Sequence, residues 1–222
     1  MSVPVRDAAT LVLLRDVGDT LEVFMVRRSL RLVFGGGAHV FPGGAVDPSD
    51  ADVGADPFRV AAIRECFEEA GYLLAYDEAG ELVSLGDERL ADRFKRHRAA
   101  LQQGARSLAD VCREDDLRPA VDTLAYLSRW VTPEGAPRRF DTRFFVCAAP
   151  LEQTPLHDRT ETIAHEWVRP SDALERHGRG QFDLMFPTLK TLEWLASETS
   201  VDGALAAAAA GAMATSEEFL RG

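Results

Sequence analysis

The chain has 222 residues, of which 46% are hydrophobic and 27% are charged, which indicates a globular protein rather than a disordered one. Its formal net charge of −11 argues against general binding to nucleic acid or to an anionic membrane, because no basic surplus is available to neutralise phosphates. Scattered cysteines without a CxxC pair, no bilayer-length apolar run and no signal-peptide core predict a cytoplasmic protein with free thiols.

Apolar and alternating segments predict strands in the first fifty residues. Residues 8–15 and 21–28 are expected to form a hairpin across a turn at 16–19. The triple glycine at 35–37 marks a loop, because consecutive glycines weaken any regular element. A third strand is predicted over residues 39–46, where it enters a Pro-Gly-Gly turn.

An acidic loop over residues 47–57 is expected to lead into a helix. Asp56 supplies an oxygen at the N-cap, and Pro57 suits the first helical position. Gly71 suits the left-handed position that ends the helix. The buried face is predicted from apolar residues at helical spacing, namely Val60, Ile63, Phe67 and Ala70.

The remainder of the chain is predicted to add helices and strands in alternation. A polar stretch at about 86–118 is expected to be a helical insertion. The other predicted elements are strands at 126–131, 138–148 and 164–168 and helices at 171–178 and 187–197. We expect one domain over residues 1–222, with an alanine-rich tail from about residue 200 that is a weak helix or frayed. This order favours an α/β sandwich over a repeating βαβ fold.

Three glutamates of the predicted helix lie on one face. Glu65, Glu68 and Glu69 are spaced by three and four residues, so their side chains are neighbours on the helix surface. Like charges at this spacing repel one another. A hard divalent cation such as Mg²⁺ is the natural partner, because it prefers carboxylate oxygens and remains free to bind phosphate.

Gly44 and the segment Arg-Glu-Cys-Phe-Glu-Glu-Ala-Gly-Tyr, which begins at Arg64, resemble the Nudix box of the Nudix hydrolases. That box reads Gly, five residues, Glu, seven residues, then Arg-Glu-apolar-x-Glu-Glu-x-Gly-apolar. This chain departs from it at two points. Asp50 stands where the family has Glu, and 13 residues separate Asp50 from Arg64.

The interrupted box resembles the acyl-CoA diphosphatase subgroup of peroxisomes and related bacterial proteins. Residues 130–133 (Trp-Val-Thr-Pro) and 138–145 (Arg-Arg-Phe-Asp-Thr-Arg-Phe-Phe) also resemble that subgroup, over roughly residues 8–198 in all. The resemblance implies a Nudix-like α/β/α sandwich with a mixed sheet. It also implies dependence on Mg²⁺, or on Mn²⁺ in its place.

The resemblance further implies roles for individual residues. The metal ligands are expected to be Glu65, Glu68, Glu69 and the carbonyl of Gly44. Glu68 is also expected to act in catalysis, with Arg64 orienting a box carboxylate through a bidentate pair.

The base that activates water is left open by the sequence. Family members take it from the box or from a later loop, where Glu161 is the candidate and Glu166 the alternative. Residues expected to bind substrate are Arg28, Arg139 and Arg143. For the last two, a solvated strand face or an ion pair with Asp141 is the competing interpretation.

The resulting hypothesis is metal-dependent hydrolysis of a nucleoside diphosphate linked to another moiety. CoA or acyl-CoA is the leading substrate, giving 3′,5′-ADP and (acyl-)4′-phosphopantetheine. ADP-ribose or NADH is the alternative substrate, and a nucleotide-sensing domain without hydrolytic activity is the alternative class. The expected partner is this small nucleotide, without nucleic acid or membrane, and a homodimer is left open.

Overall fold

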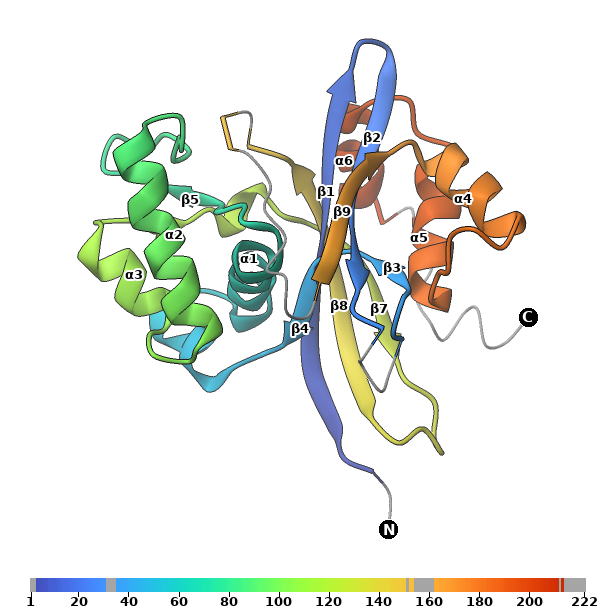
Figure 1. Cartoon of the computed structure of the whole chain (residues 1–222), viewed down its shortest axis with the longest axis horizontal. Helices are drawn as coiled ribbons and strands as arrows, with labels where there is room; N and C mark the ends of the chain where they lie inside the picture. Colours follow the sequence, from blue (N-terminus) through green and yellow to red (C-terminus); the bar gives the residue numbers. More distant parts are fainter. Residues whose placement is uncertain (1–2, 31–34, 151, 154–161, 212, 214–222) are drawn as a thin grey trace.

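A mixed β-sheet lies between two groups of helices (Figure 1). This computed structural model describes residues 3–30, 35–150, 152, 153, 162–211 and 213. The helices are α1 (Pro57–Ala70), α2 (Glu88–Gln102), α3 (Leu108–Glu114), α4 (Pro170–Gly178), α5 (Phe186–Leu195) and α6 (Val201–Ala209). Helices α1, α2 and α3 lie on one side of the sheet and α4, α5 and α6 on the other, which confirms the predicted sandwich.

The central sheet combines one parallel pair of strands with antiparallel pairs. Its strands are β1 (Val5–Val17), β2 (Thr20–Arg28), β3 (His39–Val40), β4 (Gly43–Ala45), β7 (Ala125–Val131), β8 (Arg139–Ala148) and β9 (Thr162–Val168). Their order is β3-β2-β1-β8-β7, with β9 beside β2 and β4 beside β1. Strands β1 and β8 run parallel, whereas β1 and β2 form the predicted antiparallel hairpin.

The prediction of one continuous strand at residues 39–46 is wrong. Strand β3 pairs with β2 (Val26↔Val40), whereas β4 pairs with β1 (Thr10↔Gly43), so the chain changes its neighbour between them. Pro42 lies at this crossing, where its missing N–H is no loss. Its carbonyl accepts a hydrogen bond from Leu11 N at 2.9 Å. Strands β2 and β4 therefore follow one another along the same edge of β1, and β4 brings Gly44 beside α1.

The segment before α1 is more ordered than the predicted loop. It contains a 3₁₀ helix, η1 (Pro48–Val53), which begins with a capping box in which Asp47 N donates to Asp50 Oδ2 at 2.8 Å. Helix α1 then begins and ends where the sequence predicts. Asp56 Oδ1 accepts from Phe58 N at 3.0 Å, and Gly71 adopts the left-handed conformation at φ 82°.

Alternation along the strands divides the core between the two faces of the sheet. Leu11 and Leu13 of β1 pack on the α1 face, and Val12 and Leu14 pack on the opposite face. Helix α6 belongs to the second face, because its side chains Val201, Ala204 and Ala208 are buried there. The alanine-rich tail was expected to be a weak helix or frayed, and residues 201–209 of it form a packed helix.

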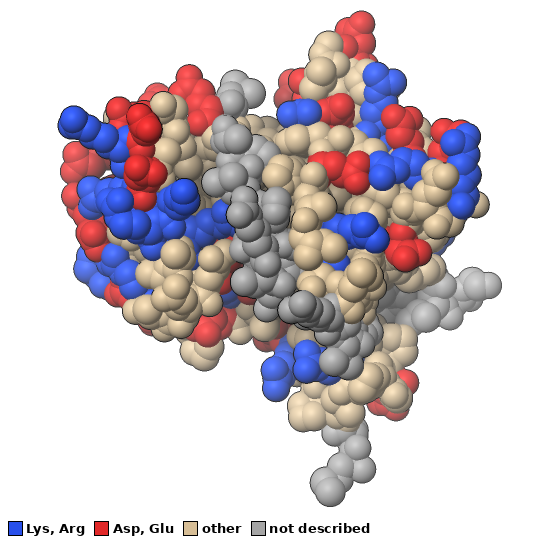
Figure 2. Space-filling view, viewed as in Figure 1, with Lys and Arg blue, Asp and Glu red and all other residues tan. Residues whose placement is uncertain are grey.

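A short two-stranded sheet closes the insertion. Strand β5 (Ala75–Tyr76) pairs with β6 (Arg118–Pro119), and helices α2 and α3 lie on the excursion between them. Lys and Arg side chains gather over this part of the surface (Figure 2), in contrast with the negative net charge of the chain. Among the described residues, no helix is long and apolar enough to cross a membrane.

Candidate active site

The glutamate face of α1 forms one wall of a large cavity. Glu65, Glu68 and Glu69 line a cavity of about 830 Å³ together with Gly43 and Gly44 of β4. Cavities of this size are typical of small-molecule sites. The structure therefore brings together the carboxylates and the glycine that the sequence singled out.

Arg64 connects this face to the preceding segment. Its Nε and Nη2 donate to Asp50 Oδ1 and Oδ2 at 2.8 and 3.0 Å, and its Nη1 donates to Glu65 and Glu68 at 2.8 and 3.2 Å. Burial on its own would lower the pKa of Arg64, but the bonds to Asp50 and the charge of Glu65 outweigh it, and the pKa is raised. The guanidinium therefore stays charged and holds two of the carboxylates in place.

Asp50 is the partner that fixes Arg64. Its side chain is only 1% exposed, and it accepts the bidentate pair as well as the bond from Asp47 N. The longer spacing to Arg64 is absorbed by η1, which brings Asp50 back to the helix. The sequence alone gives no sign of this return, because Asp50 and Arg64 are 14 positions apart in the chain.

Glycine is required at residues 43 and 44 by close contacts. A Cβ on Gly44 would lie 2.5 Å from the carboxylate of Glu65, a distance shorter than any that real Cβ atoms keep from other heavy atoms. A Cβ on Gly43 would lie 2.5 Å from the backbone oxygen of Ala9. The Gly44 backbone thus sits directly against a carboxylate, whereas Gly43 is confined by β1.

The carboxylates suit a hard divalent cation, although they do not surround one in this arrangement. The oxygens of Glu65, Glu68 and Glu69 do not all lie within 4.8 Å of one another. Two of these side chains turn toward Arg64, and Glu69 Oε2 accepts from Gly43 N at 3.1 Å. Because they share one helical face, side-chain rotation is enough to bring the oxygens together. The donor set therefore fits Mg²⁺ or Mn²⁺.

A second acidic group in the described part of the chain is less suited to a metal. His97, Glu114 and Asp115 offer atoms within 4.8 Å of one another on the insertion. Arg93 already contacts Asp115 at 2.7 Å, and Arg106 contacts Glu114. These two arginines neutralise the carboxylates that a cation would need.

Much of the remaining cavity wall is apolar. It is formed by β7, β8 and the beginning of α5, through Trp130, Phe140, Phe144, Met185 and Phe186. Phe186, which is 52% exposed, packs edge-on against Trp130 with 5.8 Å between the ring centroids. Trp130 also belongs to the buried core, and nothing in the sequence marks which buried aromatic residues border a cavity.

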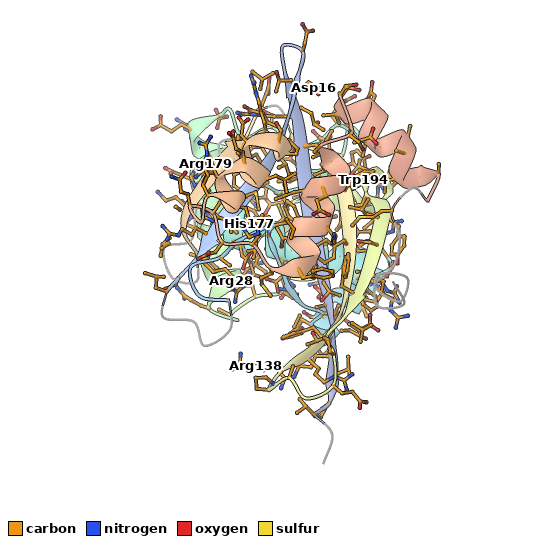
Figure 3. The ribbon with its side chains drawn as sticks, turned by 90° about the vertical axis from the view of Figure 1, so that its right-hand side faces the viewer. Asp16, Arg28, Arg138, His177, Arg179 and Trp194 are labelled. Carbon is orange, nitrogen blue, oxygen red and sulfur yellow. The ribbon has the colours of Figure 1, made fainter. Side chains whose placement is uncertain are left out.

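Arg28, one of the three predicted substrate-binding residues, lies on the cavity wall. It is the last residue of β2, on the side of the molecule shown in Figure 3. Its Nε is buried without a hydrogen-bond partner among the described residues. A buried donor without a partner costs free energy, so a ligand anion is its natural acceptor.

The two other predicted substrate-binding arginines do not line this cavity. Phe140, Thr142 and Phe144 of β8 face it, so the alternate residues Arg139 and Arg143 point to the other face. Arg143 stacks on Phe58 at 3.6 Å, and Arg139 Nε donates to Thr132 O at 3.1 Å. The predicted ion pair with Asp141 is made instead by Arg129, at 2.7 Å.

The two candidate bases outside the box have different outcomes. Glu166 on β9 is paired with Arg176 at 2.7 Å and does not line the cavity. Glu161 lies outside the described residues.

Comparisons with known proteins identify a matching family. Residues 53–195 match the family described as NUDT19 Nudix domain. The acyl-coenzyme A diphosphatase NUDT19 of Gallus gallus is 29% identical in an alignment of length 212 that covers 70% of this chain and 56% of that protein. The human protein of the same name is 34% identical over 125 residues, 53% of this chain and 33% of that protein. This chain thus covers less than two thirds of each relative.

A solved relative shares the fold over most of both chains. The crystal structure of a Nudix hydrolase from Alicyclobacillus acidocaldarius is 31% identical, covers 92% of this chain and 96% of its own, and superposes with a TM-score of 0.81. Nudix proteins generally use a divalent metal such as Mg²⁺ or Mn²⁺, which agrees with the carboxylate face. The family match over more than half of the chain, supported by this relative, shows that the protein belongs to the Nudix hydrolases.

Proposed function

We propose that this protein hydrolyses the diphosphate bond of CoA or acyl-CoA, with Mg²⁺ as its metal ion. The observation that carries the proposal is that one cavity joins the carboxylate face of α1 to a group of aromatic side chains on β7, β8 and α5. A diphosphate would occupy the carboxylate end, and an acyl-pantetheine arm would lie along the aromatic residues. The names of the chicken and human relatives support the same substrate class.

In the proposed reaction, a water oxygen bonds to one phosphorus and the bond from that phosphorus to the bridging oxygen breaks. The products are 3′,5′-ADP and (acyl-)4′-phosphopantetheine. Glu65, Glu68, Glu69 and the Gly44 carbonyl would hold the metal, which when bound neutralises phosphate oxygens and lowers the pKa of water. The water proton passes to Glu68 or to Glu161, the two bases that we propose.

Arg28 and Arg64 have separate tasks in this scheme. Arg64 has its donors committed to Asp50, Glu65, Glu68 and the Ala45 carbonyl, so it orients the carboxylates rather than the substrate. Arg28 has a buried Nε without such a commitment among the described residues, so it binds a substrate phosphate.

The alternative functions make different demands on the cavity. ADP-ribose and NADH carry a polar group in place of an apolar arm, so they leave the aromatic wall without a matching ligand. A domain that only senses nucleotides has no need for three glutamates on one helical face, two of them held by a buried arginine. Both alternatives are therefore less well supported than CoA.

The test is product analysis with CoA, acyl-CoA esters, NADH and ADP-ribose, each with Mg²⁺ and with a chelator. We expect 3′,5′-ADP from CoA and acyl-CoA, dependent on the metal and lost in Glu68→Gln while that variant stays folded. Cleavage of ADP-ribose or NADH but not of CoA would contradict the substrate. Tight binding of one nucleotide without cleavage of any would establish the sensing function instead.

A further inference from the structure

Helix α1 ends at Ala70, directly after the glutamates that line the cavity. Its last carbonyls have no partner within the helix, as at every helix C-terminus. Gly71 N satisfies the carbonyl of Phe67 at 3.0 Å. The next two carbonyls belong to Glu68 and Glu69, two of the residues that would hold the metal.

The insertion satisfies these two carbonyls. Arg98 of α2 donates from Nε to Glu68 O and from Nη2 to Glu69 O, both at 3.0 Å. Gln102, one turn further along α2, donates from Nε2 to Glu68 O at 2.6 Å. Arg98 is only 7% exposed, and its positive charge lies at the negative end of the α1 dipole.

These bonds act on the direction of the glutamate side chains. The peptide units that follow Glu68 and Glu69 are held by a planar guanidinium and an amide, so they cannot tilt freely. The orientation of a peptide unit sets the direction in which the neighbouring Cα–Cβ bond leaves the helix. Gln102 also lines the cavity itself, so α2 reaches the site as well as supporting it.

We propose that Arg98 and Gln102 are positioning residues that hold the carboxylates of Glu68 and Glu69 in the geometry that binds the metal. The insertion then contributes directly to the geometry of the metal site. This inference rests on the proposed function for the metal-binding role of those two glutamates. Residues that hold a metal ligand without contacting the metal commonly change the metal affinity by about 10–100-fold when they are replaced.

The test compares Arg98→Met and Gln102→Leu with wild type and with Arg96→Met. Arg96 is an exposed neighbour on the same helix, and it is not bonded to α1 in the structure, so it is the matched control. Binding of Mn²⁺ to the full chain is measured by electron paramagnetic resonance of the free ion, alongside the Mg²⁺ dependence of hydrolysis and the Tm. We expect Arg98→Met to weaken Mn²⁺ binding about tenfold or more, Gln102→Leu to weaken it less, and Arg96→Met to leave it unchanged.

If Arg98 only caps the C-terminus of α1, a different result is expected. In that case Arg98→Met lowers the Tm while Mn²⁺ affinity and the Mg²⁺ concentration for half-maximal rate stay at wild-type values, and the inference is overturned. If Arg98→Met does not fold, Gln102→Leu and Arg98→Lys are measured in its place. Unchanged Mn²⁺ binding in both of these variants also overturns the inference. Failure of the substrate proposal is distinguishable, because it leaves the response of Mn²⁺ binding intact while CoA remains uncleaved.

Discussion

The pair of Asp50 and Arg64 offers the sharpest test of how the site is held. Asp50→Asn keeps the shape of the side chain but removes its charge and turns an amide N–H toward a guanidinium that can only donate. The variant leaves a buried arginine without its bidentate partner. The carboxylates of Glu65 and Glu68 are then free to draw the guanidinium out of place.

The magnitude follows from burial. The Asp50 side chain is 1% exposed and that of Arg64 is 10% exposed, so solvent screens the pair little. Breaking a buried pair costs about 3–5 kcal/mol. Because Arg64 keeps two glutamates and the Ala45 carbonyl, we expect about 3 kcal/mol, which for a chain of this length lowers the Tm by about 6–12 °C. The rate of hydrolysis at limiting Mg²⁺ should fall about 10–100-fold.

Thermal unfolding and Mg²⁺-dependent kinetics are measured on the same samples. Asp52→Asn is the matched control, because Asp52 lies exposed on the same 3₁₀ helix. It should change neither quantity. A variant at residue 50 with the Tm and rate of wild type would refute the argument that this buried pair orients the box.

Four further variants test the site and the fold around it. Gly44→Ala should lower activity strongly with little change in Tm, because the three atoms nearest its Cβ all belong to the movable Glu65 carboxylate. Gly43→Ala should lower the Tm through its clash with the Ala9 backbone, and equal effects of the two variants would contradict this. Arg28→Gln should raise KM about tenfold or more with kcat less affected, and an unchanged KM would remove its phosphate contact. Burial lowers the pKa of His39 below 6.5, with Glu166 opposing and Arg27 and Arg176 adding to the shift. The free energy of unfolding should therefore fall as pH drops below 6.5, where the unfolded chain binds the proton more readily. His39→Gln should reduce that fall between about pH 7 and about pH 5, and parallel stability curves for the variant and wild type would exclude this role of His39.

Local signals in the sequence predicted α1 well. The N-cap Asp56, the proline after it and the left-handed Gly71 each specify a backbone conformation directly, so both ends of the helix were predictable. The β1–β2 hairpin was predictable from its alternation for the same reason. Helix α4 shows the limit, because it begins at Pro170 with Arg169 as N-cap, ahead of the expected Ser171.

Features that depend on pairing partners were not predictable. The break between β3 and β4 arises because the chain moves from β2 to β1, and no local propensity encodes that change. Arg139 and Arg143 illustrate the same point within a strand. Their residue types suit phosphate, but the register of β8 turns them away from the cavity. The bonds from Arg98 to α1 join residues 29 and 30 positions apart, a contact that only the folded chain reveals.

A crystal of the full chain soaked in Mn²⁺ and recorded for anomalous scattering tests the central claim most directly. The prediction is a manganese peak against Glu65, Glu68 and Glu69, with the side chains rotated toward it and Arg64 still bonded to Asp50. A peak confined to His97, Glu114 and Asp115, or carboxylates that stay apart with no metal among them, would contradict it.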